Sequence, residues 1–181
     1  MEQATGLQPA AVIWITGISR SGKTTLANGL KELLGETTRG PVQVLDGSFV
    51  RDEVGGFFGY SREERVRVSR ILAVTARLLA ANGVCVIVTS ITPYQESRDY
   101  NRATISKYYE IFLKCDVEIC SKRDPEGLFE RAKRGDISQF IGVDSPFELP
   151  KSSDLVVDTG DSSAEQMIEV ASAQVQHFLN S

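Results

Sequence analysis

The sequence feature that most constrains the fold is the octapeptide Gly17-Ile18-Ser19-Arg20-Ser21-Gly22-Lys23-Thr24, which matches G-x-x-x-x-G-K-[ST] at every fixed position. It follows an apolar run at residues 11–15 and opens a stretch with helical spacing. Its backbone N–H groups can therefore converge on phosphate oxygens at a helix N-terminus. We expect Lys23 to reach the β- and γ-phosphates of a nucleotide and the Thr24 hydroxyl to bind Mg²⁺. A chance glycine-rich turn is the alternative.

Strand-like and helix-like segments alternate along the chain. The strand candidates are short apolar runs rich in β-branched or aromatic residues, as is typical of strands covered on both faces, and they lie at residues 11–15, 42–45, 84–88, 109–113 and 154–157. Helical spacing occurs at residues 24–34, 62–82, 95–107, 117–133 (with a break near Asp124-Pro125) and 164–179. This alternation predicts a doubly wound α/β fold with a parallel sheet.

Length and composition favour one ordinary globular domain. With 181 residues and ~150 residues per typical domain, we expect a single domain over residues 1–181. Residues 135–153 show no periodicity, and an irregular stretch of that length in a compact domain is more often a functional lid than a linker. The 20 lysines and arginines against 24 aspartates and glutamates give a net charge of −4, which argues against a general nucleic-acid binder.

Location and redox state also follow from composition. The first ten residues have no basic start, and no apolar run approaches the roughly 20 residues needed to span a bilayer, so we expect a cytoplasmic protein without membrane contact. The three cysteines form no C-x-x-C pair, and we expect them to be reduced and mostly buried.

A second candidate site residue, Asp46, ends the second predicted strand in the sequence Leu45-Asp46-Gly47-Ser48, with Arg51 shortly after it. The carboxyl ends of parallel strands form the crevice in which such sheets bind ligands. Asp46 could orient an acceptor hydroxyl, take its proton or hold Mg²⁺ through water. The alternative is an ordinary Asp-Gly turn. Since the guanine-reading motif NKxD is absent, a kinase is favoured over a GTPase.

Several segments, in order, resemble motifs of the adenylylsulfate (APS) kinase family: GISRSGKTT, LDGSFVR, GYSREER, SITPYQESRDYNR and KRDPEGLFERAKRGDISQFIGVDSPFELP. The resemblance covers nearly the whole chain. It implies a P-loop kinase fold with a five-stranded parallel sheet, a mobile lid at approximately residues 123–153, and often a homodimer. It also implies MgATP as the donor and the 3′-hydroxyl of adenylyl sulfate as the acceptor, with 3′-phosphoadenylyl sulfate (PAPS) and ADP as the products.

The resemblance assigns roles to individual residues. It implies that ATP is bound by Gly17, Ser19, Ser21, Gly22, Lys23, Thr24 and Thr25. The substrate contacts that it implies are Asp46, Arg51, Tyr60, Arg65, Ile91, Thr92, Pro93 and Phe140. Among these, Arg51 and Arg65 would contact the phosphosulfate and Tyr60 would stack on the acceptor adenine. Arg123 would be a lid cation near the transferring phosphoryl group, acting in catalysis with Lys23 and Asp46.

Simpler structural roles compete with some of these assignments. Tyr60 and Phe140 could be core aromatic residues. The arginines at positions 62, 65, 67 and 70 could form the solvated face of a helix, paired with Glu63 and Glu64.

The sequence departs from the family pattern on the acceptor side. The family motif LDGDN reads LDGSF here, so Ser48 replaces an aspartate and Phe49 an asparagine. Val68 replaces an asparagine, Ser138 a lysine and Ile141 a threonine. Charged hydrogen bonds contribute roughly 1.5–3 kcal/mol each, so such losses would matter to acceptor binding. The alternative hypotheses are a changed acceptor, which could be another nucleotide such as CDP-phosphoramidate or a small phosphorylated alcohol, and a nucleotide-binding relative without turnover.

Overall fold

The central sheet has five strands, all parallel, in a computed structural model that describes residues 9–38, 40–54 and 57–181. The strands are β1 (Val12–Thr16), β2 (Val42–Asp46), β3 (Cys85–Thr89), β4 (Tyr108–Lys114) and β5 (Leu155–Asp158). Their order across the sheet is β2-β3-β1-β4-β5, with β1 at the centre. The predicted parallel α/β sheet is therefore confirmed.

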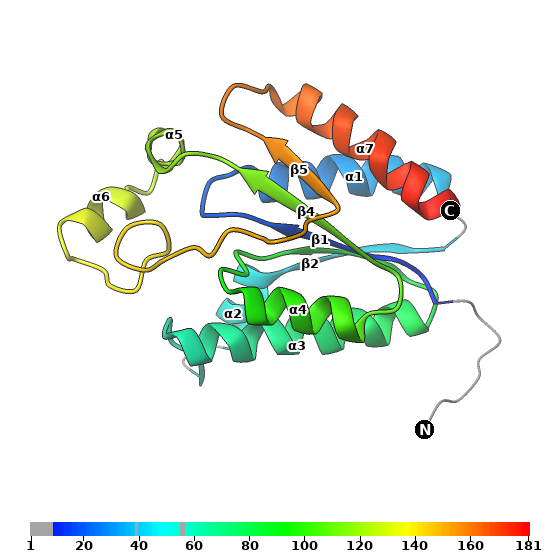
Figure 1. Ribbon diagram of the computed structural model, residues 1–181, viewed down its shortest axis with the longest axis horizontal. Helices are drawn as coiled ribbons and strands as arrows, with labels where there is room; N and C mark the ends of the chain where they lie inside the picture. The colour runs from blue at the N-terminus through cyan, green and yellow to red at the C-terminus, as the bar shows by residue number, and fades with distance from the viewer. Residues whose placement is uncertain (1–8, 39, 55–56) are drawn as a thin grey trace.

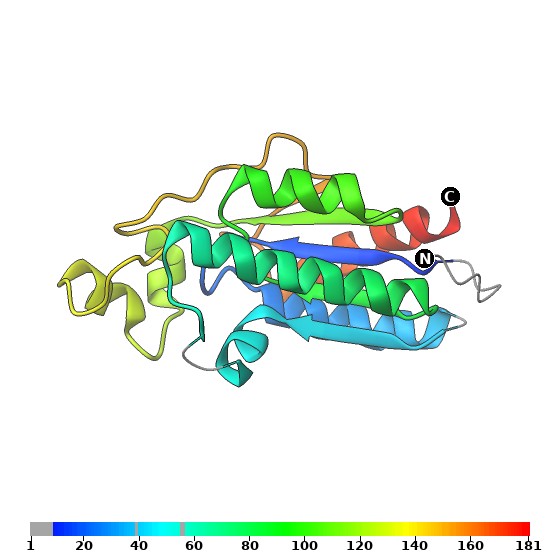
Figure 2. The same ribbon diagram turned by 90° about the horizontal axis from the view of Figure 1, so that it is seen from below.

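Helices cover both faces of the sheet (Figure 1). One face is covered by α1 (Lys23–Thr37) and α7 (Ala164–Asn180), and the other by α3 (Arg62–Ala81) and α4 (Gln95–Thr104). Seen from below, α3 and α4 lie along the strands (Figure 2). Three shorter helices, α2 (Gly47–Glu53), α5 (Val117–Lys122) and α6 (Leu128–Lys133), complete the described part of the chain.

The core consists of two apolar layers because the sheet buries both of its faces. Every residue of β1 is buried, and its side chains alternate between the two layers. Toward α1 and α7 the layer contains Ile13, Ile15, Leu26, Leu30, Met167 and Val175. Toward α3 it contains Val12, Trp14, Leu72, Ala73 and Ala76. Burial of each of the larger side chains among them, such as the leucines and isoleucines, adds roughly 1.5–3 kcal/mol to the free energy of unfolding.

The observed elements follow the sequence predictions closely. Every predicted strand is present within one or two residues of its expected ends, and the expected break near Asp124-Pro125 separates α5 from α6. The seven-residue helix α2 was not predicted. Residues 135–153 have no helix or strand apart from a single bridge between Ile141 and Ser145.

Two further expectations concern membranes and cysteines. Among the helices of residues 9–38, 40–54 and 57–181, none has the length and apolar character needed to cross a bilayer. The expectation drawn from the first ten residues falls mostly on residues 1–8, which lie outside the described part. All three cysteines are free thiols, and Cys85 and Cys120 are buried, as predicted.

Candidate active site

One large cavity, of about 770 Å³, opens at the carboxyl ends of the strands. This is where an open parallel sheet binds its ligands, because the loops that follow neighbouring strands diverge there. Most of the residues predicted for the site line this cavity: Ser19, Ser21, Gly22, Lys23, Thr24, Thr25, Asp46, Arg51, Tyr60, Arg65, Ile91, Thr92, Pro93 and Arg123. Segments more than a hundred residues apart in the sequence thus share one pocket.

The phosphate loop owes its shape to its glycines. Gly17 has φ 151° and Gly22 has φ 102°, where side chains are strained. A Cβ on Gly17 would lie 2.7 Å from the carbonyl oxygen of Leu113, so only glycine fits there. Gly22 is the N-cap of α1, and the helix N-terminus therefore points into the cavity that the loop lines. Oriented amides of this kind favour an anionic ligand.

Lys23 folds back on the loop that carries it. Its Nζ donates to the carbonyl oxygens of Gly17 (3.0 Å) and Ile18 (2.7 Å). Burial lowers the pKa of Lys23 to about 8, because a charged ammonium loses hydration there. A bound phosphate would supply the missing negative charge at this point.

Asp46 caps the helix that follows it and also lines the cavity. Its Oδ1 accepts from the backbone N–H groups of Ser48 (2.8 Å) and Phe49 (3.1 Å), which makes it the N-cap of α2. Its Oδ2 accepts from the hydroxyl of Thr89 at 2.7 Å. The turn interpretation is therefore correct, and the same carboxylate lines the cavity.

Tyr60, between α2 and α3 in the chain, has its ring in contact with two arginines that also line the cavity. The guanidinium carbons of Arg51 and Arg65 are 4.7 and 5.1 Å from the centre of its ring. Arg65 also donates to the backbone oxygens of Tyr60 (2.9 Å) and Gln139 (2.7 Å). Because the Tyr60 side chain is 52% exposed, the core-residue alternative is wrong for it. Arginine–aromatic stacking of this kind makes a ready surface for a planar base and an anion.

Phe140 does not line this cavity. It packs edge-on against Phe129, with ring centres 4.9 Å apart, in a small apolar cluster with Cys120 and Ile141. Its amide and that of Gln139 both donate to the Asp144 carboxylate, which closes a tight turn and directs the ring inward. Phe140 is therefore partly buried in this cluster, close to the core alternative, and its contact with a substrate stays a prediction. Gly17, the first residue of the phosphate loop, is also outside the lining.

Arg123 is held against the loop between β5 and α7. Its guanidinium donates to the carbonyl oxygens of Thr159 (2.8 Å) and Gly160 (3.1 Å). Another arginine, which the sequence reasoning missed, is Arg20. It has φ 61° in the middle of the phosphate loop and pairs with Asp124 (3.2 Å) and Glu126. An arginine inside a G-x-x-x-x-G-K-T motif facing an Asp-Pro-Glu turn is the only sequence signal for this pair.

Two of the five departures from the family pattern line the cavity. Ser48 is exposed and Val68 is 5% exposed, and both contribute to the lining. Phe49 is exposed and Ile141 is buried beside Phe129, and neither is part of the lining, nor is Ser138. The cavity lining therefore differs from the family pattern at two positions.

A magnesium ion would depend mainly on the nucleotide. Within residues 9–38, 40–54 and 57–181 there is no group of three acidic, histidine or cysteine side chains that could hold a metal. Thr24, exposed at the start of α1, lines the cavity. One hydroxyl together with phosphate oxygens and waters is a sufficient ligand set for Mg²⁺ at a nucleotide, so the residues present fit the ion.

Comparison with known proteins places the chain in a family. The family model described as adenylylsulphate kinase matches residues 9–158. A probable adenylyl-sulfate kinase of Archaeoglobus fulgidus is 43% identical over 148 residues, which are 82% of this chain and 95% of that protein. A probable bifunctional SAT/APS kinase of Sorangium cellulosum is 37% identical over 168 residues, 92% of this chain, and the chain spans only 29% of that longer protein.

A solved structure agrees with the same assignment. The Mycobacterium tuberculosis APS kinase CysC, in complex with AMPPNP and APS, superposes with a TM-score of 0.85 at 32% identity. The superposition covers 97% of this chain and all of that one. With its phosphate loop, its parallel sheet and these similarities taken together, the chain belongs to the adenylylsulphate kinase family.

Proposed function

We propose that this protein transfers the γ-phosphoryl group of ATP to the 3′-hydroxyl of adenylyl sulfate, giving PAPS and ADP. The observation that carries the proposal is that one cavity holds both halves of such a site. The phosphate loop lines one part, and Tyr60 with Arg51 and Arg65 lines another. A solved relative that superposes on this chain is described as a complex with an ATP analogue and APS.

In this proposal the residues act by positioning and by neutralising charge. Lys23 and the loop amides bind the β- and γ-phosphates, while Arg51 and Arg65 hold the acceptor's anionic group. Asp46, fixed by its three hydrogen bonds, orients the attacking hydroxyl. Arg123 contributes positive charge beside the lid. Mg²⁺, bound through Thr24, would neutralise charge on the phosphates.

The proposal extends to the organisation of the chain. Residues 1–181 form one domain in which residues 123–153 act as a lid, and the protein is a homodimer in the cytoplasm. Sedimentation velocity of the purified protein measures the oligomeric state directly.

A second candidate is the same donor chemistry with a changed acceptor. The observation that favours it is the replacement of two lining residues by Ser48 and Val68, which removes a carboxylate and an amide from the acceptor wall. Other nucleotides, CDP-phosphoramidate or a small phosphorylated alcohol would then be preferred.

A coupled assay of ADP release separates these candidates. Adenylyl sulfate is compared at equal concentration with adenosine, cytidine and uridine nucleotides and with phosphorylated alcohols. We expect adenylyl sulfate to give a kcat/KM of ~10⁴ M⁻¹s⁻¹ or more, as is ordinary for enzymes. Preference for another acceptor would favour the second candidate, and ATP binding without any transfer would favour a non-catalytic role.

The variant Ser48→Asp tests the altered position itself. Because Ser48 lines the cavity on the turn that Asp46 caps, an aspartate there would restore a carboxylate close to the acceptor. We expect kcat/KM for adenylyl sulfate to rise severalfold. Ser48→Asn, similar in size and uncharged, is the control and should give no gain. Equal effects of the two variants would show that charge at this position is unimportant.

A further inference from the structure

The cavity wall formed by residues 91–93 contains an unusual backbone conformation. Thr92 has φ 42°, in the left-handed region that β-branched residues rarely adopt, and it precedes a proline. Such conformations persist only where the surrounding structure holds them, and they concentrate at ligand-binding sites. The groups that hold Thr92 in place are therefore of functional interest.

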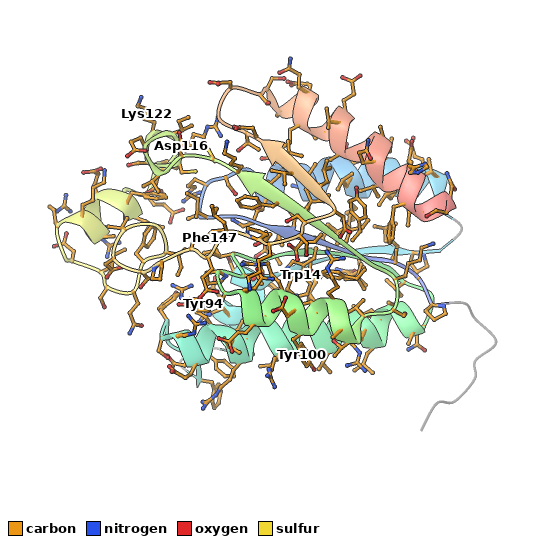
Figure 3. The ribbon with its side chains drawn as sticks, viewed as in Figure 1. Trp14, Tyr94, Tyr100, Asp116, Lys122 and Phe147 are labelled. Carbon is orange, nitrogen blue, oxygen red and sulfur yellow. The ribbon has the colours of Figure 1, made fainter. Side chains whose placement is uncertain are left out.

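Hydrogen bonds from β1 hold one side of this wall. The Trp14 indole N–H donates to the Thr92 hydroxyl at 2.9 Å, and the hydroxyl of Thr16 donates to the Ile91 carbonyl oxygen at 2.7 Å. Both donors belong to the fully buried central strand. Figure 3 labels Trp14 together with Tyr94 and Phe147, aromatic residues of the same region.

Arg98 of α4 holds the other side. Its side chain is buried, with only 2% of its surface exposed, and its Nη1 donates to the Thr92 carbonyl oxygen at 2.7 Å. Its Nη2 donates to the carbonyl oxygen of Glu148, in the segment after α6, at 2.6 Å. One guanidinium group thus binds the cavity wall and the lid segment at the same time.

The lid segment itself is attached to the same wall. The backbone N–H of Glu148 donates to the Pro93 carbonyl oxygen at 2.8 Å, and its carboxylate accepts from the N–H of Gln95 at 2.7 Å. The Gln95 side chain accepts in turn from Arg98 at 3.0 Å. Because the backbone oxygens of residues 91, 92 and 93 are all engaged in this way, the wall faces the cavity with its conformation fixed.

The chemistry at this position calls for arginine. Two carbonyl oxygens and one amide oxygen lie around one planar group, and only a guanidinium presents that many donors in a fixed plane. Burial lowers the pKa of Arg98, and the carboxylates of Glu110 and Glu148 act in the opposite direction. A lysine carries its three donors on one nitrogen, where they diverge tetrahedrally, so it cannot reproduce the two separate nitrogens in one plane with which Arg98 reaches Thr92 and Glu148.

We propose that Arg98 is a positioning residue for acceptor binding, joining the 91–93 wall to the lid segment at Glu148 so that the wall keeps the shape that the acceptor requires. Arg98 does not line the cavity, so it acts through Thr92. The inference rests on the proposed function for the identity of the acceptor. It adds that acceptor affinity depends on a buried group outside the pocket.

Steady-state kinetics of Arg98→Lys test the proposal. We expect the KM for adenylyl sulfate to rise at least tenfold, while the KM for ATP stays within twofold, because the phosphate loop has no bond to Arg98. In Arg98→Ala, millimolar methylguanidinium should restore part of the acceptor affinity. Arg102→Lys is the matched control: Arg102 lies one turn later on α4, pairs with Asp154 and donates to the Ser152 carbonyl oxygen but not to residues 91–93, so both KM values should stay unchanged.

A second readout does not depend on turnover. In Arg98→Lys, amide hydrogen exchange should become faster at residues 90–94 and 147–149 together, and remain as in the wild type over the phosphate loop. If Arg98→Lys does not fold, Thr92→Gly, which removes the indole bond and the backbone constraint, should raise the acceptor KM by a similar factor.

The outcomes separate the two proposals. A folded Arg98→Lys with an unchanged acceptor KM, or with unchanged exchange in both segments, would overturn the role of Arg98. A uniform loss of ATP and acceptor affinity would also overturn it, since that result indicates a purely structural role. If the wild type does not phosphorylate adenylyl sulfate, the proposed function fails, and the exchange measurement still decides whether Arg98 couples the wall to the lid segment.

Discussion

At the scale of single residues, Lys23 and Asp46 show how the site is prepared by its own backbone. Lys23 is satisfied by carbonyl oxygens of the phosphate loop, and Asp46 by amides of the following helix. Each side chain is thereby held before any ligand arrives. Preorganisation of this kind lowers the cost of ordering a site during binding and reaction.

The lowered pKa of Lys23 has a consequence for stability against pH. The folded pKa is about 8 and the ordinary value is 10.5, so between these limits the unfolded chain binds more protons at this residue than the folded chain. The free energy of unfolding of the wild type should therefore rise, relative to that of Lys23→Met, as the pH increases from 8 to 10.5. Urea unfolding of both proteins at pH 7 and pH 10 measures this. Lys31→Met, on the same helix and exposed, should show no such trend. A constant difference between wild type and Lys23→Met would contradict the prediction.

The two roles of Asp46 can be separated by Asp46→Asn. Asparagine is as good an N-cap as aspartate, so the free energy of unfolding should change by less than about 0.5 kcal/mol. The carboxylate charge is lost, and kcat should fall by ~10²-fold or more. Asp46→Ala also loses the cap, so its free energy of unfolding should be about 1 kcal/mol lower than that of Asp46→Asn. Chemical denaturation and initial rates give both quantities. An active Asp46→Asn would reduce Asp46 to a capping residue.

At the scale of helices and strands, the sequence was informative where the pattern is local. Buried apolar runs marked the five strands, and glycine and lysine spacing marked the phosphate loop. Helix α2 escaped prediction because it is short and because its start depends on the Asp46 cap. Arg20 escaped because its partner Asp124 lies 104 residues away. Arg98 escaped because its carbonyl partners, Thr92 at 6 residues and Glu148 at 50 residues, are backbone groups that carry no sequence signature. Phe140 lies outside the cavity lining at a turn closed by Asp144, a local contact that the apolar pattern does not reveal.

The start of α3 also connects stability to the site. Ser61 and Glu64 form a capping box, and Glu64 accepts in addition from the Gly59 amide at 2.8 Å. These bonds lie on either side of Tyr60 in the chain, the residue whose ring contacts Arg51 and Arg65. Ser61→Ala should lower the free energy of unfolding by about 1 kcal/mol and raise the acceptor KM, with the ATP KM unchanged. Ser163→Ala removes the equivalent cap of α7 and serves as the comparison: Ser163 also lines the cavity, but its capping bonds run only to Gln166, so the variant should cost similar stability without a change in acceptor KM. If both variants behave alike in kinetics, the cap of α3 has no special part in the site.

At the scale of the whole molecule, the cavity joins loops from all parts of the chain, so ligands should stabilise the protein globally. AMPPNP with Mg²⁺ at 100 times its dissociation constant should add about 2.7 kcal/mol to the free energy of unfolding. AMPPNP should therefore raise the melting temperature, and this increase should be smaller when EDTA removes Mg²⁺. In Thr24→Ala the increase caused by AMPPNP should differ less between Mg²⁺ and EDTA than in the wild type. Thr24→Ser keeps the hydroxyl and should show the same difference as the wild type. Thermal melts followed by circular dichroism provide the measurement, and a shift in Thr24→Ala equal to that of the wild type would exclude Thr24 as a magnesium ligand.

The strand order also governs how the chain can acquire its structure during synthesis. The first two strands made, β1 and β2, are not neighbours, because β3 lies between them. Within the described part of the first 84 residues no two strands pair, so the phosphate loop has no paired strand beside it until β3 leaves the ribosome. Parallel pairing between distant segments is slow and exposes apolar surface meanwhile. A ribosome that stalls before residue 89 would thus present an apolar strand and a glycine-rich loop to chaperones and proteases, although in the finished protein that strand is fully buried and the loop lines the cavity.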